Sequence, residues 1–223
     1  MQTREGGERA EKALEELCTG YWFPLYAWCR RYGLGAADAE DMVQGFFLKA
    51  VEKGLFASAD AARGKLRTFL LTALQRHVKD EHGKSMAVRR GGGRVLSFDA
   101  VEAEEWYAVE CVEGESPDHM YDRQWALTLL DQAIGRLEED AAKRSKQEVF
   151  EALRPFLAGE GSGADYERAA SGLGMSAGAF KVAVHRYRAR FREALKEEVR
   201  CTQGEAADVE AELGYLMEVL RGR

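Results

Sequence analysis

Residues Tyr166 to Arg190 read YERAASGLGMSAGAFKVAVHRYRAR and carry the clearest structural pattern in the chain. The first part of this stretch has a helical pattern that ends at glycines, and Gly174 permits the sharp backbone turn that joins two helices. Ser176 follows this turn, and serine is among the residue types that best cap the N-terminus of a helix. The stretch therefore predicts a helix, a tight turn and a second helix.

The second helix of this pair is expected to carry one apolar stripe and one cationic stripe. Its apolar residues recur every three or four positions and are Phe180, Val184, Tyr187, Phe191 and Leu195. Each member of the second stripe comes one residue after an apolar one, about 100° around the helix, and these are Lys181, His185, Arg188 and Arg192. A helix of this kind after a tight turn is typical of a recognition helix in the DNA major groove. The alternative is a surface helical hairpin that binds no DNA.

Charge is distributed unevenly along the 223 residues, whose net charge is −6. The segment 63–94 has nine basic and two acidic residues, whereas the segment 99–122 has nine acidic residues and neither lysine nor arginine. Two basic zones separated by an acidic stretch predict two modules that face nucleic acid, joined by an acidic linker. Chance clustering on solvated helix faces would produce the same pattern, so charge alone leaves this open.

The first module is expected to be helical throughout. Tyr21, Leu25 and Trp28 continue an apolar stripe that begins at Leu14, and Pro24 within it predicts a kink or a break. A second helix is expected from about residue 36 and a third from about 64 to 82, followed by a glycine- and arginine-rich loop up to residue 94. In the C-terminal tail, apolar residues at 209, 213, 216 and 220 predict an amphipathic helix that packs on the second module or acts as a regulatory or partner-binding element.

Three stretches together resemble the extracytoplasmic-function group of sigma factors, in the sigma-70 family of bacterial RNA polymerase subunits. Residues 38–48 (DAEDMVQGFFL) look like the motif that docks on the polymerase. Residues 66–80 (LRTFLLTALQRHVKD) look like the helix that melts and reads the −10 promoter element, and residues 166–190 look like the helix-turn-helix that reads the −35 element. The resemblance covers roughly residues 14–199. It implies a promoter-specificity subunit that binds core RNA polymerase and directs transcription initiation.

The resemblance also implies roles for individual residues. The residues expected to contact polymerase are Asp38, Glu40, Asp41 and Gln44, since carboxylates can pair with arginines on a partner. The residues expected at the −10 element are Arg67, Phe69, Arg76, Lys79, Arg89 and Arg90. At the −35 element, the residues expected to face base edges are Lys181, His185 and Arg186, and those expected at phosphates are Ser176, Arg188 and Arg190. Gly45 departs from the family, which usually has an acidic residue there, so docking is expected to be weakened or conditional.

These observations predict an all-α protein with two small helical domains. Residues 1–94 would dock on polymerase and read the −10 element, residues 95–120 would form an acidic linker, residues 121–200 would hold the helix-turn-helix, and residues 201–223 would form a C-terminal helical extension. The expected partners are core RNA polymerase and promoter DNA, with an anti-sigma factor or a kinase as candidate regulators. No cofactor or metal site is expected.

Other classes of protein fit the sequence less well. No apolar run approaches the roughly 18 residues of a membrane span, and the charged N-terminus does not resemble a signal peptide, which predicts a cytoplasmic protein without membrane insertion. The four cysteines are widely spaced, as expected of reduced thiols. The sequence has no phosphate-binding GxxxxGK[ST] and no HExxH motif. Residues 174–178 (GMSAG) match GxSxG, but they follow a predicted helix and not the strand that this motif requires, so we expect no enzyme. The alternative function is a stand-alone helix-turn-helix regulator whose N-terminal domain senses a signal or dimerises.

Overall fold

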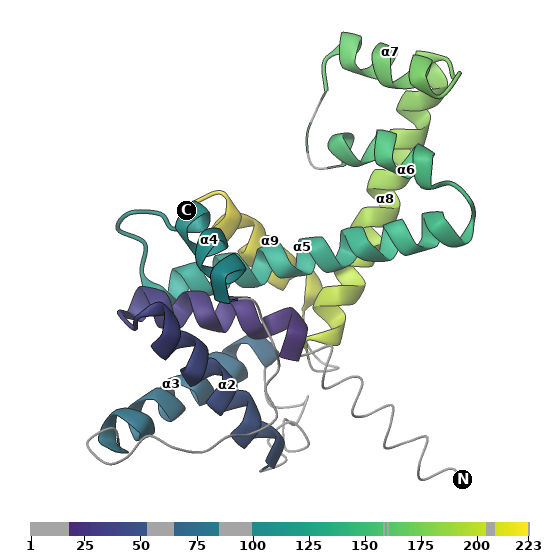
Figure 1. The fold of residues 1–223 in the computed structure, drawn as a ribbon. Helices are drawn as coiled ribbons and strands as arrows, with labels where there is room; N and C mark the ends of the chain where they lie inside the picture. The colour runs from purple at the N-terminus through teal and green to yellow at the C-terminus, as the bar shows by residue number, and fades with distance from the viewer. Residues whose placement is uncertain are drawn as a thin grey trace. The chain divides into compact units, whose positions relative to one another are not determined.

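The computed structural model describes residues 18–52, 65–84, 100–157, 159, 161–203 and 208–222, and every regular element in those ranges is helical (Figure 1). The predicted all-α class is therefore confirmed. The chain divides into two compact units, residues 1–128 together with 202–223, and residues 129–201. None of the helices within the described ranges is long and apolar enough to cross a membrane.

The first unit is built around aromatic side chains. Its helices are a first helix over residues 18–32, α2 (Ala36–Glu52), α3 (Leu66–Lys84), α4 (Ala100–Glu110), the beginning of α5 (Pro117–Lys143), and α9 (Val209–Leu220). Tyr21 stacks on Trp125 of α5 with ring centroids 4.0 Å apart, and Trp22 stacks on Tyr26 at 4.9 Å. The apolar face predicted for the first helix is buried at Tyr21, Leu25 and Trp28. The helix is continuous through Pro24, so the chain does not break there.

The acidic stretch differs from the linker that the sequence predicts. Residues 100–110 form α4, and Glu104 accepts hydrogen bonds from Tyr26 Oη at 2.6 Å and from Arg30 Nε at 2.8 Å and Nη2 at 2.6 Å. The bonds from Arg30 hold the pKa of Glu104 below its usual value. Tyr121 and Trp125 of α5 are also buried in the first unit, so the division between the units falls within α5, after Thr128, instead of at residue 120.

The C-terminal helix packs on the first unit, whereas the sequence favoured packing on the second module. Leu216 and Val219 of α9 are buried, and Glu212 pairs with Lys65 and Arg67 at the start of α3. The chain before α9 also contacts α3, because the Thr202 carbonyl accepts a 2.9 Å hydrogen bond from the Leu66 N–H. Periodicity predicted the helix but could not identify the surface that would cover its apolar face.

The second unit contains the remaining part of α5 and four further helical segments. These are α6 (Gln147–Leu153), the short 3-10 helix η2 (Arg154–Phe156), α7 (Gly163–Gly172) and α8 (Ala177–Cys201). One apolar cluster joins α6, η2, α7 and α8 through Leu153, Phe156, Ala170, Phe180 and Val184. A second cluster joins α5 to α6 through Leu137, Ala141, Phe150 and Leu157. Tyr187 of α8 packs against both clusters, which fixes the orientation of α8 within this unit.

Two cysteines of the first helix are expected to be unreactive in the folded protein. Burial raises the pKa of Cys18 to about 11 and that of Cys29 to about 12, and only a thiolate reacts readily with alkylating agents. Cys201, by contrast, is exposed. Iodoacetamide at mildly alkaline pH should therefore modify Cys201 in the native chain and reach Cys18 and Cys29 only in denaturant, as peptide mass spectrometry would show. Rapid native labelling of Cys29 would contradict the packing of this helix.

Candidate functional site

Local hydrogen bonds define the α7–α8 pair. Ser162 and Asp165 form a capping box at the start of α7: the Ser162 side chain accepts from the Asp165 N–H at 3.3 Å, and the Asp165 carboxylate accepts from the Ser162 N–H at 3.0 Å. Gly174 has φ of +64°, a conformation that favours glycine. Ser176 Oγ accepts from the Ala179 N–H at 3.2 Å, so the predicted turn and N-terminal cap are both confirmed.

Packing between α7 and α8 centres on Phe180. Its ring meets those of Phe156 and Tyr166 edge-on, with centroids 5.4 Å and 6.0 Å away. Val184 continues the buried stripe, whereas the last three residues of the predicted stripe, Tyr187, Phe191 and Leu195, are only half-buried. Since α8 buries this face, its opposite face is left to solvent.

The exposed face of α8 carries three of the predicted recognition residues. Lys181, His185 and Arg186 are all exposed. Lys181 Nζ lies over the Tyr166 ring, 5.5 Å from its centroid, which ties the first cation of the stripe to α7. These side chains lie in the first three turns of α8, directly after the turn.

Arg188 and Arg190, predicted to contact phosphates, are instead engaged within the second unit. Arg188 Nε donates to the Phe156 carbonyl at 2.8 Å and its Nη2 donates to the Gly159 carbonyl. Arg190 pairs with Asp140 of α5 at 2.8 Å. Each guanidinium thus satisfies polar groups of its own domain, and an α-helical spacing alone could not reveal these partners.

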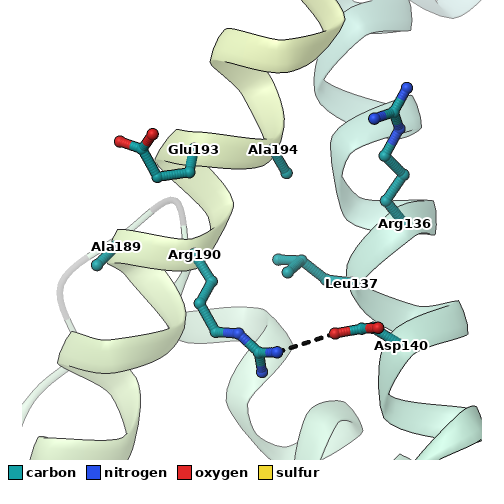
Figure 2. Close-up of a pocket in the computed structure, with 7 residues that line it drawn as sticks. All are labelled: Arg136, Leu137, Asp140, Ala189, Arg190, Glu193 and Ala194. Atoms are coloured by element: carbon teal, nitrogen blue, oxygen red, sulfur yellow. Dashed lines mark hydrogen bonds and ion pairs between the residues drawn. The ribbon is translucent and has the colours of Figure 1, made fainter.

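A groove of about 520 Å³ lies between α5 and α8 in the second unit (Figure 2). Its lining consists of Arg136, Leu137, Asp140, Ala189, Arg190, Glu193 and Ala194. Arg190 reaches towards Asp140 across this groove, and Arg136 pairs with Glu198. Burial raises the pKa of Glu198 despite this pairing. Because both arginines are paired with carboxylates, the groove offers no unpaired cation for an anionic ligand.

The predicted −10 residues of α3 do not share one surface. Arg76 and Lys79 are exposed and Phe69 is half-buried. Arg67 precedes Arg76 by nine residues, which is two and a half helical turns, so the two side chains leave opposite faces of α3. Arg67 follows the buried face, whereas Arg76 follows the exposed one. The other two predicted residues, Arg89 and Arg90, lie outside the described residues.

Arg67 is the centre of a buried ionic cluster. Its guanidinium pairs with Asp122 of α5 and, at 3.3 Å, with Glu212 of α9, and it lies 4.8 Å from the Tyr215 ring centroid. Tyr121 Oη donates to the Arg67 carbonyl at 2.9 Å. Burial by itself would lower the pKa of Arg67, but attraction to the two carboxylates outweighs it and the pKa is raised. In this structure Arg67 holds α3, α5 and α9 together, and its guanidinium is directed into this cluster.

The predicted docking residues lie on the first half of α2. Asp38 and Asp41 are exposed, while Glu40 and Gln44 are half-buried and joined by a 3.0 Å hydrogen bond from Gln44 Nε2 to Glu40 Oε1. A Cβ added at Gly45 would lie 3.5 Å from His77 Nε2, an ordinary contact, so the backbone there does not require glycine.

Two apolar residues extend the same region of α2. Leu48 and Val51 are exposed, and Leu48 follows Asp41 by seven residues, which places both on one face. Leu48 ends the predicted docking motif, but no contact was predicted for it. Its spacing from Asp41 is the signal that could have identified it.

No protein-family model matches the chain, and no curated protein or solved structure is significantly similar to it. Within the described ranges, no group of three or more His, Cys, Asp or Glu side chains is placed to hold a metal ion. What the chain does must therefore be inferred from its own two surfaces, the exposed cationic face of α8 and the acidic and apolar face of α2.

Proposed function

We propose that the chain is a promoter-specificity subunit of bacterial RNA polymerase, similar to sigma factors of the extracytoplasmic-function group. The observation that carries this proposal is the combination of two surfaces on two separate units. One unit has a capped α8 with Lys181, His185 and Arg186 exposed after a tight turn, and the other has α2 with Asp38 and Asp41 exposed. Neither surface alone would distinguish a promoter-specificity subunit from a stand-alone DNA-binding regulator.

The α8 face supports binding to the −35 element. Lys181 and Arg186 would attract phosphates and reach base edges in the major groove, where arginine and lysine can donate two hydrogen bonds to guanine. His185 lies between them in sequence and is exposed with them. Arg188 and Arg190 would support this surface by holding α8 to the rest of its unit, since Arg188 bonds to the Phe156 carbonyl and Arg190 pairs with Asp140.

The exposed face of α3 supports binding to the −10 element. Arg76 and Lys79 provide cations, and the half-buried Phe69 provides an aromatic side chain at the same helix. Bases of a single strand stack on aromatic rings while cations hold the phosphates. Arg67 takes no part in this contact.

The α2 face supports docking on the polymerase. Asp38 and Asp41 can pair with arginines, and Leu48 adds an apolar contact on the same face. A subunit that gains most of its DNA affinity through the polymerase need not be basic, which accords with the net charge of −6. We place such a subunit in the cytoplasm.

The experiment that tests this proposal is a pull-down of purified bacterial core RNA polymerase. We expect the wild-type chain to bind and an Asp38→Ala/Asp41→Ala variant to bind at least about tenfold more weakly, since charged contacts at an interface are each worth several kcal/mol when desolvated. The matched control is Glu148→Ala/Glu151→Ala, which removes two exposed acids from α6 and should bind as the wild type does.

Two results would contradict the proposal. Binding that the α2 variant retains would show that α2 is not the docking surface. If the wild-type chain did not bind polymerase but bound specific duplex DNA by itself, it would be a stand-alone helix-turn-helix regulator.

A further inference from the structure

Helix α4 presents two chemically different faces. Its inner face contacts the first helix through Glu104 and Tyr107, and its outer face carries Trp106 and Val109. The sequence predicts an acidic linker in this region, and neither face of the helix has a predicted role. The helix belongs to the first unit, where it is labelled in Figure 1.

The inner face is held by strong polar contacts. Glu104 accepts three hydrogen bonds from Tyr26 and Arg30, and the Arg30 guanidinium also lies over the Tyr107 ring, 5.0 Å from its centroid. Just after α4, Arg31 contacts Cys111 Sγ at 3.7 Å. These contacts hold the Glu104 and Tyr107 side of α4 against the first helix.

The outer face is apolar and exposed. Trp106 is 54% exposed and Val109 is 84% exposed, and Val112 directly after the helix is also exposed. Phe23 of the first helix meets Trp106 edge-on, with ring centroids 6.1 Å apart, and widens the patch. Exposed apolar patches with a polar rim mark interaction sites, and tryptophan is prominent among the residues that dominate binding energy.

Carboxylates flank this patch. Glu105 and Glu113 are exposed on either side of Val109 in sequence, and neither pairs with a cation among the described residues. The whole segment 99–122 lacks lysine and arginine. A second copy of this chain would bring the same negative charges to the contact, and like charges oppose association.

We propose that Trp106 and Val109 on the outer face of α4, together with Phe23 of the first helix and Val112 after α4, form a docking surface for a cationic amphipathic helix of another protein. The apolar side of that helix would cover Trp106 and Val109, and its lysines or arginines would meet Glu105 and Glu113. This is the helix-in-groove type of recognition with added charge complementarity. The inference does not depend on the proposed role in transcription.

The test uses the full chain and its own tryptophans. Trp22, Trp28 and Trp125 are buried, so Trp106 is the exposed one of the four. The probe is a tryptophan-free leucine–lysine helix of about 14 residues, and its control is the same peptide with every leucine replaced by glutamine. We expect the leucine peptide to shift tryptophan emission to shorter wavelength and to protect it from acrylamide, and the glutamine peptide to do neither.

Variants separate this contact from general attraction between charges. Val109→Asn leaves the charge unchanged and should weaken peptide binding, followed by anisotropy of a labelled peptide, at least about tenfold. The matched control is Met217→Asn, which alters an exposed apolar residue of α9 and should bind as the wild type does. Trp106→Phe should abolish the emission shift. Glu105→Gln/Glu113→Gln should reduce the dependence of binding on salt.

Several outcomes would overturn the proposal. Equal binding of both peptides, or unchanged binding to Val109→Asn, would mean that the attraction is only electrostatic. Absence of binding would mean that the face accepts no such helix. Protection of Trp106 from acrylamide in the free chain would mean that another segment of the same chain already covers it.

Discussion

Replacing Arg67 by alanine is expected to destabilise the first unit by about 3–5 kcal/mol, the usual cost of removing one partner from a buried ion pair. The side chains of Arg67 and Asp122 are each 12% exposed and that of Glu212 is 3% exposed. The substitution would leave both carboxylates buried without this cation. It would also remove the contact between the guanidinium and Tyr215.

Urea unfolding followed by tryptophan fluorescence measures this effect, because all four tryptophans belong to the first unit. The control is Arg76→Ala, which removes an exposed arginine from the opposite face of α3 and should change stability by no more than about 0.5 kcal/mol. If Arg67→Ala unfolded like the wild type and only lost affinity for DNA, the role predicted from the sequence would be right and the cluster would not be structural.

Replacing Phe180 by alanine is expected to destabilise the second unit by about 3–5 kcal/mol. Phe180 is fully buried and packs edge-on against Phe156 and Tyr166, so the change removes apolar contact and leaves a cavity where α7, α8 and η2 meet. The control is Val182→Ala on the same helix, because Val182 is 51% exposed and should matter little.

Two signals distinguish the units in this experiment. Far-UV circular dichroism reports helix in both units, whereas tryptophan fluorescence reports the first unit alone. We expect Phe180→Ala to bring part of the circular dichroism transition to lower urea and to leave the fluorescence transition in place. An equal shift of both signals would show that the two units unfold as one, since α5 contributes residues to both.

The helices themselves were largely predictable. The expected start near residue 36 matches α2, which begins at Ala36, and the helix expected over residues 64–82 is α3, Leu66–Lys84. The predicted glycine turn and the cap at Ser176 were confirmed because turns and caps depend on residues close together in the chain. Buried faces such as that of Phe180 and Val184 follow from the helical period, which is also local.

Individual roles of charged residues were much less predictable. Arg67, Arg76 and Lys79 are all cationic and lie on one helix, yet the Arg67 side chain is only 12% exposed within an ionic cluster, whereas the other two residues are exposed. Likewise Arg188 and Arg186 are two residues apart on α8, and only Arg188 donates to carbonyls of its own domain. The residues next to a cation in the sequence do not show which distant group it will pair with in the fold.

The helical class, the main helices, their apolar faces and the turn before α8 could all be predicted from the amino-acid pattern, because each depends on spacings of only a few residues. The tertiary structure alone decided which cations stay exposed, that α4 forms within the acidic stretch, and that α9 covers the first unit. Arg67, for example, pairs with Asp122, which lies 55 residues away along the chain, and with Glu212, which lies 145 residues away. A periodic pattern predicts that one face of a helix will be buried, but only the packed fold determines which other elements cover that face.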